Sequence, residues 1–201
     1  MAPSPIERDP FAVPRRVASL MAGFSRPWFL AGGWAIDLWL GRVTRHHEDA
    51  EIAIFREDQA EIRRHLAGWT FDKVADTPEG HRALSWREEE RLELPIHEIH
   101  ARGVAGDLRD LEILLNESDR DVWRFRRDQR VTLPISEAGL FMAGIPILAP
   151  EIVLLFKAKT PRPRDEPDFR NALARLTPAG RTWLRGALEM AHPGHPWIAA
   201  L

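Results

Sequence analysis

Two carboxylates lie two residues apart in the segment DAEIAIF, residues 49–55. The segment alternates in polarity and is expected to be a β-strand, since strand side chains point alternately to the two faces. Asp49 and Glu51 then share one face, with α-carbons roughly 6.5–7 Å apart, while the intervening residues form an apolar face. Carboxylates at this spacing can converge on one divalent cation, because such cations prefer oxygen ligands.

A second strand with an acidic face is expected from Asp110 to Leu115. Asp110, Glu112 and Leu114 lie on one face of it, and three apolar residues lie on the other. This strand therefore offers two further carboxylates on a single face.

A short, ordered series of elements precedes the first acidic strand. The apolar run Trp28 to Ala31 ends at the pair Gly32-Gly33, and an apolar helix from Trp34 to Leu40 stops at Gly41. A basic loop, residues 42–47, then leads into the strand.

A lysine lies within an apolar helix further along the chain. This helix is expected to start at Ala149-Pro150 and to end before Pro161, and it is apolar almost all round. Such a helix should be buried, so Lys157 requires an anionic partner.

Length, composition and charge are those of an ordinary globular protein. The 201 residues are 44% hydrophobic and 29% charged, and the formal net charge of −2 indicates neither nucleic-acid nor membrane binding. The absence of cysteine excludes disulfides, thiol catalysis and zinc-thiolate sites. No run approaches about 18 apolar residues, and residues 1–20 show no secretory signal. We therefore expect a cytoplasmic protein.

The order of the expected elements divides the chain in two. Helices from Pro14 and from Glu57 alternate with short strands near residues 69–74, 82–86 and 95–101 and a strand or hairpin over 122–133. After residue 140 the pattern becomes helical, with starts at Pro150, Asp165 and Thr177-Pro178. We predict an α+β fold: a mixed sheet flanked by helices over residues 1–140 and a short helical region over 141–201.

The segment GGWAIDLWLGRVTRHHEDAEI, residues 32–52, resembles the signature of one branch of the polymerase-β-like nucleotidyltransferases. This is the aminoglycoside adenylyltransferase and lincosamide nucleotidyltransferase branch. Its members carry a Gly-Gly turn, a short helix, a G-R-x-T-R loop and a His-x-Asp-x-Asp strand in this order. A second segment, residues 146–169, resembles a later helical segment of such proteins.

The resemblance implies Mg²⁺-dependent transfer of a nucleotide, AMP by default, from a nucleoside triphosphate to a hydroxyl of a small molecule. An aminoglycoside- or lincosamide-like antibiotic is the first acceptor class, and nucleic acid is not an expected partner. Mg²⁺ is commonly held by one or two carboxylates plus phosphates, and two such ions can bind the attacking and leaving oxygens. By resemblance, Asp49 and Glu51 are metal ligands. Glu112 is the third carboxylate, which helps to activate the hydroxyl, and Asp110 is the alternative.

The same resemblance implies a nucleotide site around the glycine pair. Gly32 and Gly33 let the backbone approach the triphosphate, and the helix N-terminus at Trp34 offers free N–H groups. Further expected nucleotide-binding residues are Arg42, Thr44, Arg45, His47 and Lys157.

One position departs from the branch pattern: the second carboxylate is Glu51 rather than aspartate. The extra methylene of glutamate moves the carboxylate by about an ångström or more, and Mg²⁺ tolerates little geometric error. The rival hypothesis is therefore a fold relative that binds nucleotide or a protein partner with weak or no catalysis. A second rival is the same chemistry acting on protein or RNA.

Several motifs have a structural interpretation beside the functional one. Asp165 and Asp168 are expected to cap a helix N-terminus. His97 and His100 should point to opposite faces of a strand, which argues against a shared metal. The arginines of residues 120–130 are expected on a solvated strand face, with a phosphate-binding or acidic-partner patch as the alternative; they are Arg124, Arg126, Arg127 and Arg130.

Overall fold

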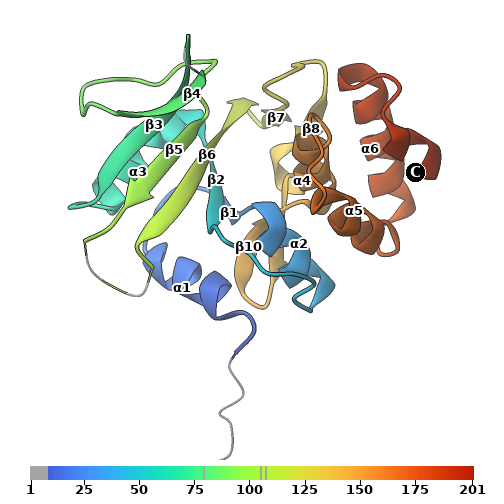
Figure 1. The fold of residues 1–201 in the computed structure, drawn as a ribbon, viewed down its shortest axis with the longest axis horizontal. Coiled ribbons are helices and arrows are strands. Elements are labelled where there is room, and N and C mark those ends of the chain that lie inside the picture. Colours follow the sequence, from blue (N-terminus) through green and yellow to red (C-terminus); the bar gives the residue numbers. More distant parts are fainter. Residues whose placement is uncertain (1–8, 79, 105, 107) are drawn as a thin grey trace, which may run out of the picture.

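The computed structural model of the chain describes residues 9–78, 80–104, 106 and 108–201. In this part of the chain ten strands form one mixed sheet with helices packed against it, which confirms the predicted α+β fold (Figure 1). The sheet order is β4-β3-β5-β6-β2-β1-β10-β9, and β7 and β8 extend from the end of β6. The strands are β1 (Trp28–Leu30), β2 (Glu51–Phe55), β3 (Thr70–Thr77), β4 (Gly80–Ser85), β5 (Glu98–Arg102), β6 (Asp110–Asp119), β7 (Val122–Arg124), β8 (Thr132–Pro134), β9 (Gly139–Met142) and β10 (Ile145–Leu148).

Six α-helices and three short 3₁₀ turns complete the described fold. They are α1 (Ala12–Leu20), α2 (Gly32–Leu40), η1 (Arg56–Asp58), α3 (Gln59–His65), η2 (Ile135–Glu137), α4 (Pro150–Lys157), α5 (Asp165–Leu173), α6 (Pro178–Ala191) and η3 (Pro196–Ala200). Helices α4, α5 and α6 gather beside α2 at one side of the sheet (Figure 1), and both α4 and α5 contact α2.

Strand β2 lies in the middle of the sheet, parallel to β6 and antiparallel to β1. It begins at Glu51. Asp49 was expected on the strand, but it lies in the irregular segment before it. Ala53 and Phe55, on the same side as Glu51, are only 1% and 3% exposed. Both faces of β2 are therefore buried beyond Glu51.

Helix α2 follows the sequence pattern closely. It starts at Gly32, and Gly41 ends it in the left-handed conformation with φ 74°, which glycine adopts without steric cost. The expected cap of α6 is also present, since the Thr177 hydroxyl accepts the N–H of Gly180.

The hairpin of β9 and β10 was not predicted. Ala143 and Gly144 both have positive φ, as the two-residue turns that suit hairpin twist require. Strand β10 pairs parallel with β1 through Leu30 and Ile147, so this hairpin extends the sheet across residue 140. The proposed division at residue 140 stays a prediction, and the region after it includes β10 and the end of β9.

No helix among the described residues is long and apolar enough to cross a membrane.

Candidate active site

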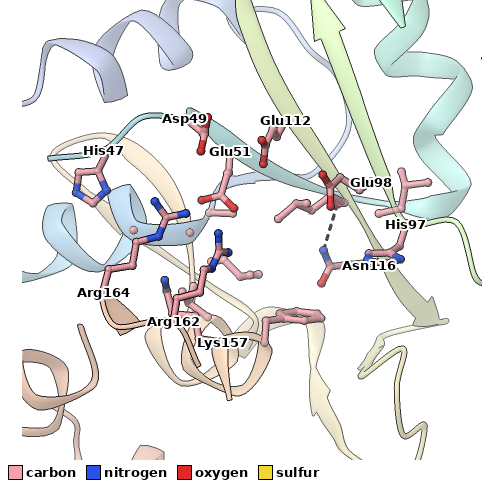
Figure 2. Close-up of a pocket in the computed structure, with 18 of the residues that line it drawn as sticks. His47, Asp49, Glu51, His97, Glu98, Glu112, Asn116, Lys157, Arg162 and Arg164 are labelled. Atoms are coloured by element: carbon pink, nitrogen blue, oxygen red, sulfur yellow. Dashed lines mark hydrogen bonds between the residues drawn. The ribbon is translucent and has the colours of Figure 1, made fainter. Parts of the chain in front are cut away.

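Strand register brings four chemically active side chains to one face of the sheet. Glu51 of β2 pairs with Glu112 of the parallel strand β6. On the other side of β6, the antiparallel strand β5 places His100 opposite Glu112 and Glu98 opposite Leu114. Because partners in register share a face, Glu51, Glu112, Glu98 and His100 lie together. Figure 2 shows the three glutamates.

Glu98, His100 and Glu112 form a cluster that could hold a metal ion. One ligand atom from each lies within 4.8 Å of the other two. The His100 Nε2 atom is 2.8 Å from a Glu98 carboxylate oxygen and 3.9 Å from one of Glu112. The sequence did not point to Glu98, although the alternation Glu98-x-His100 on an expected strand was an available signal. His97 lies directly before β5 and is not one of the three residues of this cluster.

These carboxylates lack enough cationic partners. Burial, with the charges of Glu51, Glu98 and Asp49, raises the pKa of Glu112 to about 7. Burial also raises the pKa of Glu51, although the charge of Lys157 opposes the shift. Buried carboxylates that repel one another favour a divalent cation among them.

Replacing Glu112 by glutamine is expected to stabilise the metal-free protein at neutral and alkaline pH. A raised folded-state pKa means that ionisation of Glu112 removes stability as the pH rises from about 4.5 through about 7. The Glu112→Gln change should remove this loss and add about 1–2 kcal/mol at pH 8, because one pKa unit is about 1.4 kcal/mol and water screens part of the effect. Urea unfolding in EDTA at pH 5 and pH 8 measures it.

The control for this prediction is Asp110→Asn. The Asp110 side chain is 82% exposed and lies 3.8 Å from Arg102, so its replacement should change the free energy of unfolding by less than about 0.5 kcal/mol. If both variants changed the free energy of unfolding equally at pH 8, the ionised Glu112 carboxylate would not be destabilising. Asp110, the alternative third carboxylate, does not line the pocket that Glu51 and Glu112 share.

The acidic face forms one wall of a pocket of about 350 Å³. Asp49, Glu51, Glu112 and Glu98 run across it, and Lys157, Arg162 and Arg164 lie opposite (Figure 2). Of the expected nucleotide-binding residues, five line it: Gly32, Gly33, Arg45, His47 and Lys157. Three do not: Trp34, Arg42 and Thr44.

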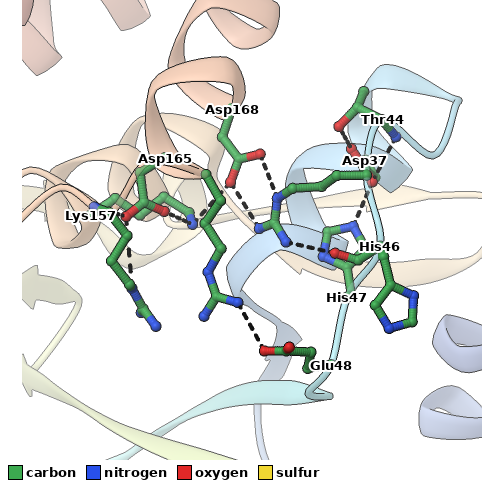
Figure 3. A network of polar contacts seen from close by, with 11 residues as sticks. Asp37, Thr44, His46, His47, Glu48, Lys157, Asp165 and Asp168 are labelled. Carbon is green, nitrogen blue, oxygen red and sulfur yellow. Dashed lines mark hydrogen bonds and ion pairs between the residues drawn. The ribbon is translucent and has the colours of Figure 1, made fainter.

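Several of these polar groups belong to a buried network of hydrogen bonds and ion pairs (Figure 3). Asp37 is fully buried and accepts the Thr44 N–H at 3.0 Å and the Thr44 hydroxyl at 2.6 Å. The same carboxylate lies 2.6 Å from Nε2 of His47, whose ring packs on Trp34 at 4.3 Å. These contacts fix the loop that leads to Asp49.

The second half of the network joins this loop to the C-terminal helices. Arg45 donates two hydrogen bonds of 3.0 Å to Asp168. Lys157 lies 2.5 Å from Asp165 and 3.0 Å from Asp168. The anionic partners that Lys157 required are therefore protein carboxylates. The expectation that Asp165 and Asp168 only cap a helix is wrong, because Asp165 is the first residue of α5 and both are buried ion-pair partners.

A family profile described as aminoglycoside-2''-adenylyltransferase matches residues 15–171, which include α2, the whole pocket wall and most of α5. The chain belongs to this family. The named branch of nucleotidyltransferases is thereby confirmed. No curated protein matches the sequence.

Solved structures related to this adenylyltransferase family share the fold. A solution structure of the antibiotic-resistance factor ANT(2'')-Ia has 18% identity and a TM-score of 0.54, covering 88% of this chain and 89% of that one. ANT(2'')-Ia in complex with adenylyl-2''-tobramycin has 15% identity and a TM-score of 0.53, covering 89% and 96%. Lincomycin-bound LnuA, a lincosamide antibiotic adenylyltransferase, has 16% identity and a TM-score of 0.51, covering 78% and 92%.

The glycine pair of this family member lies against side chains that line the pocket. Gly32 has φ 59°, and a β-carbon there would lie 1.5 Å from a Glu51 carboxylate oxygen. A β-carbon on Gly33 would lie 2.3 Å from the Arg45 guanidinium and 2.5 Å from the His47 ring. A side chain at either position would therefore displace these groups.

Replacing Gly32 by alanine is expected to destabilise the fold by about 2 kcal/mol or more, because it adds a left-handed strain and displaces the Glu51 carboxylate. The matched control is Gly186→Ala in α6, where a β-carbon meets no atom within 4 Å. That control should stabilise the protein by about 0.5–1 kcal/mol. Thermal unfolding of both variants measures the contrast, and a neutral Gly32→Ala would contradict the close approach.

Two arginines of the β7–β8 hairpin also reach the pocket. The hairpin itself was expected, and β7 pairs antiparallel with β8. Arg126 and Arg127, however, lie in its loop against Phe156 and line the pocket. The expectation of a solvated strand face is wrong for Arg126, which is half-buried.

Proposed function

We propose that this chain transfers AMP from ATP to a hydroxyl of a small molecule, with Mg²⁺ as cofactor. One observation carries the proposal: the carboxylates Asp49, Glu51, Glu112 and Glu98 line one pocket together with a glycine turn at a helix N-terminus. Carboxylates for cations and a free helix N-terminus for phosphate are the parts that phosphoryl chemistry requires.

The donor set fits Mg²⁺. Glu51, Glu112 and Glu98 provide oxygen ligands that are crowded and partly buried, and Asp49 stands exposed at the rim. Bound there, Mg²⁺ would supply positive charge to the phosphate oxygens. His100 is hydrogen-bonded to Glu98 and so orients that carboxylate.

In the proposed reaction the acceptor hydroxyl oxygen forms a bond to the α-phosphorus of ATP. The bond from that phosphorus to the bridging oxygen breaks, and pyrophosphate leaves with the bonding electrons. The hydroxyl proton passes to a carboxylate, and Glu112 and Glu98 are the two candidates on the acidic wall. The free N–H groups at the start of α2, at Gly32 and Gly33, would hold the triphosphate.

The acceptor class follows from the family and from what its relatives bind. The family description names aminoglycoside adenylylation, and the neighbour LnuA is a lincosamide adenylyltransferase. We therefore propose a hydroxylated small molecule, with aminoglycoside- and lincosamide-like antibiotics as the first class to assay.

Calorimetric titration of ATP, with Mg²⁺ and then with EDTA, tests the nucleotide site. Pyrophosphate release in the presence of an acceptor panel tests turnover. Mg²⁺-dependent binding with acceptor-dependent release supports the proposal. Mg²⁺-dependent binding without release from any acceptor, including protein and RNA, favours the non-catalytic rival. Absence of ATP, GTP and CTP binding would refute the nucleotide site.

A further inference from the structure

Arg126 is a half-buried cation that makes no ion pair with the described residues, although the charges of Glu98 and Glu117 act on it. It lies in the β7–β8 loop, with its guanidinium carbon 4.8 Å from the centroid of the Phe156 ring, and it lines the pocket. Within the described residues it has no hydrogen bond and no ion pair. Burial, followed by the charge of Arg127, lowers the pKa of Arg126 to about 9. An unpaired charge held away from water costs stability.

Four other cations of the pocket already have carboxylate partners. Lys157 and Arg45 pair with the buried aspartates of α5, and Arg164 lies 3.3 Å from Glu48. Arg162 lies 3.9 Å from Asp165. Arg126 lines the same pocket but, unlike these four, makes no ion pair with a described residue.

Two further basic groups accompany Arg126. Arg127 contacts the same Phe156 ring at 5.6 Å and donates a hydrogen bond to the Phe156 carbonyl. Burial and then the charge of Arg126 lower the pKa of His97, which places His97 close to Arg126. Figure 2 shows His97 beyond Glu98, at the end of the carboxylate row away from Asp49 and Arg164.

We propose that Arg126, with Arg127 and His97, forms an anion subsite that binds a phosphate or carboxylate group carried by the acceptor. This rests on the proposed function. In this proposal the triphosphate binds at the glycine turn and the paired cations, and the anionic group of the acceptor binds at Arg126. An acceptor whose anionic group binds Arg126 would lie along the carboxylate row.

The consequence for substrate class is specific. Among the hydroxylated acceptors proposed above, the subsite narrows the class: it disfavours a polycationic, aminoglycoside-like acceptor, which would bring like charge against Arg126 and Arg127. An acceptor with a hydroxyl and an acidic group satisfies both ends of the row. Guanidinium recognises phosphate and carboxylate through two parallel hydrogen bonds.

Arg126→Met tests the subsite, with Arg130→Met as its matched control. Arg130 lies in the same loop but is 74% exposed and pairs with Asp128. Inorganic phosphate is titrated into each protein, free and saturated with Mg²⁺ and a non-hydrolysable ATP analogue, and arginine Nε–H resonances report binding. We expect wild type and Arg130→Met to bind phosphate in both states, and Arg126→Met to bind at least about tenfold more weakly.

The remaining outcomes separate the possible sources of the anion. Phosphate binding that vanishes when the analogue is bound, together with weaker analogue binding in Arg126→Met, would assign Arg126 to the nucleotide and overturn the proposal. Unchanged phosphate binding in Arg126→Met would also overturn it. A wild type that fails to bind the analogue refutes the proposed function, whereas the phosphate arm still reports on Arg126.

Thermal unfolding adds a readout for a purely structural role. Because Arg126 makes no hydrogen bond or ion pair with the described residues, Arg126→Met should unfold at the same temperature as wild type or higher. A melting temperature well below that of Arg130→Met would instead make Arg126 a structural residue and contradict the subsite.

Discussion

Replacing Glu51 by glutamine is expected to lower nucleotidyl transfer by about 10²–10³-fold while making the metal-free protein more stable. The amide keeps the shape of the side chain against Gly32 but removes the charge that would hold a cation. Loss of one such electrostatic contact costs about 10²–10³ in rate. Stability should rise because burial raises the pKa of Glu51, so the carboxylate is a destabilising charge above its folded pKa.

Both effects can be measured on the same samples. Pyrophosphate release and Mg²⁺-dependent ATP binding report function, and unfolding in EDTA at pH 5 and pH 8 reports stability, with the gain confined to the higher pH. Asp110→Asn, the exposed carboxylate outside the pocket, serves again as the control and should change neither quantity. Full activity in Glu51→Gln would show that the Glu51 carboxylate is not part of the active site.

Glu51→Asp addresses the departure from the family pattern. It restores the aspartate of the related signature but withdraws the carboxylate from the position against Gly32. Higher transfer in this variant would show that Glu51 limits the rate. Lower transfer would show that this pocket has adapted to the longer side chain.

The features predicted from the sequence are those with a local cause. Gly41 ends α2 because glycine adopts the left-handed conformation there, and Thr177 caps α6 through its own hydroxyl. The alternation of the acidic segment placed β2 within two residues of its observed start. Such signals depend only on neighbours along the chain.

The features that were missed depend on contacts between distant segments. Glu98 joins Glu112 only through the register of β5 on β6, and a shift of one residue would turn it to the other face. Lys157 was correctly expected to need an anion, but Asp165 and Asp168 become its partners only because α5 packs against α4. The sequence predicts a surface position for Arg126, and only the fold brings the Phe156 ring against it.

The network at Asp168 gives the second large expected effect. Asp168 is 1% exposed and binds both Arg45 and Lys157. Burial would raise its pKa, but the hydrogen bonds and charges of those two partners outweigh burial and lower the pKa. Asp168→Asn leaves two cations undercompensated, so we expect a loss of about 3 kcal/mol in the free energy of unfolding at pH 7.

The sign with pH is opposite to that of Glu51. A lowered pKa gives stability that is present above about 3.8, the ordinary aspartate value, and that disappears as the pH falls through the folded pKa. Wild type and Asp168→Asn should therefore converge in strong acid. The control is Arg170→Gln in the same helix, which removes an exposed pair with Glu166 and should cost less than about 0.5 kcal/mol.

A double variant separates charge imbalance from lost packing. Adding Lys157→Met to Asp168→Asn removes one of the two stranded cations, so the pair should be less destabilised than the sum of the single changes. Strict additivity would mean that the ion pairs contribute nothing beyond packing. Because Arg45 lies against Gly33, the single Asp168 variant should also weaken Mg²⁺-dependent ATP binding at temperatures where it remains folded. Unchanged ATP binding there would show that the glycine turn keeps its geometry without support from α5.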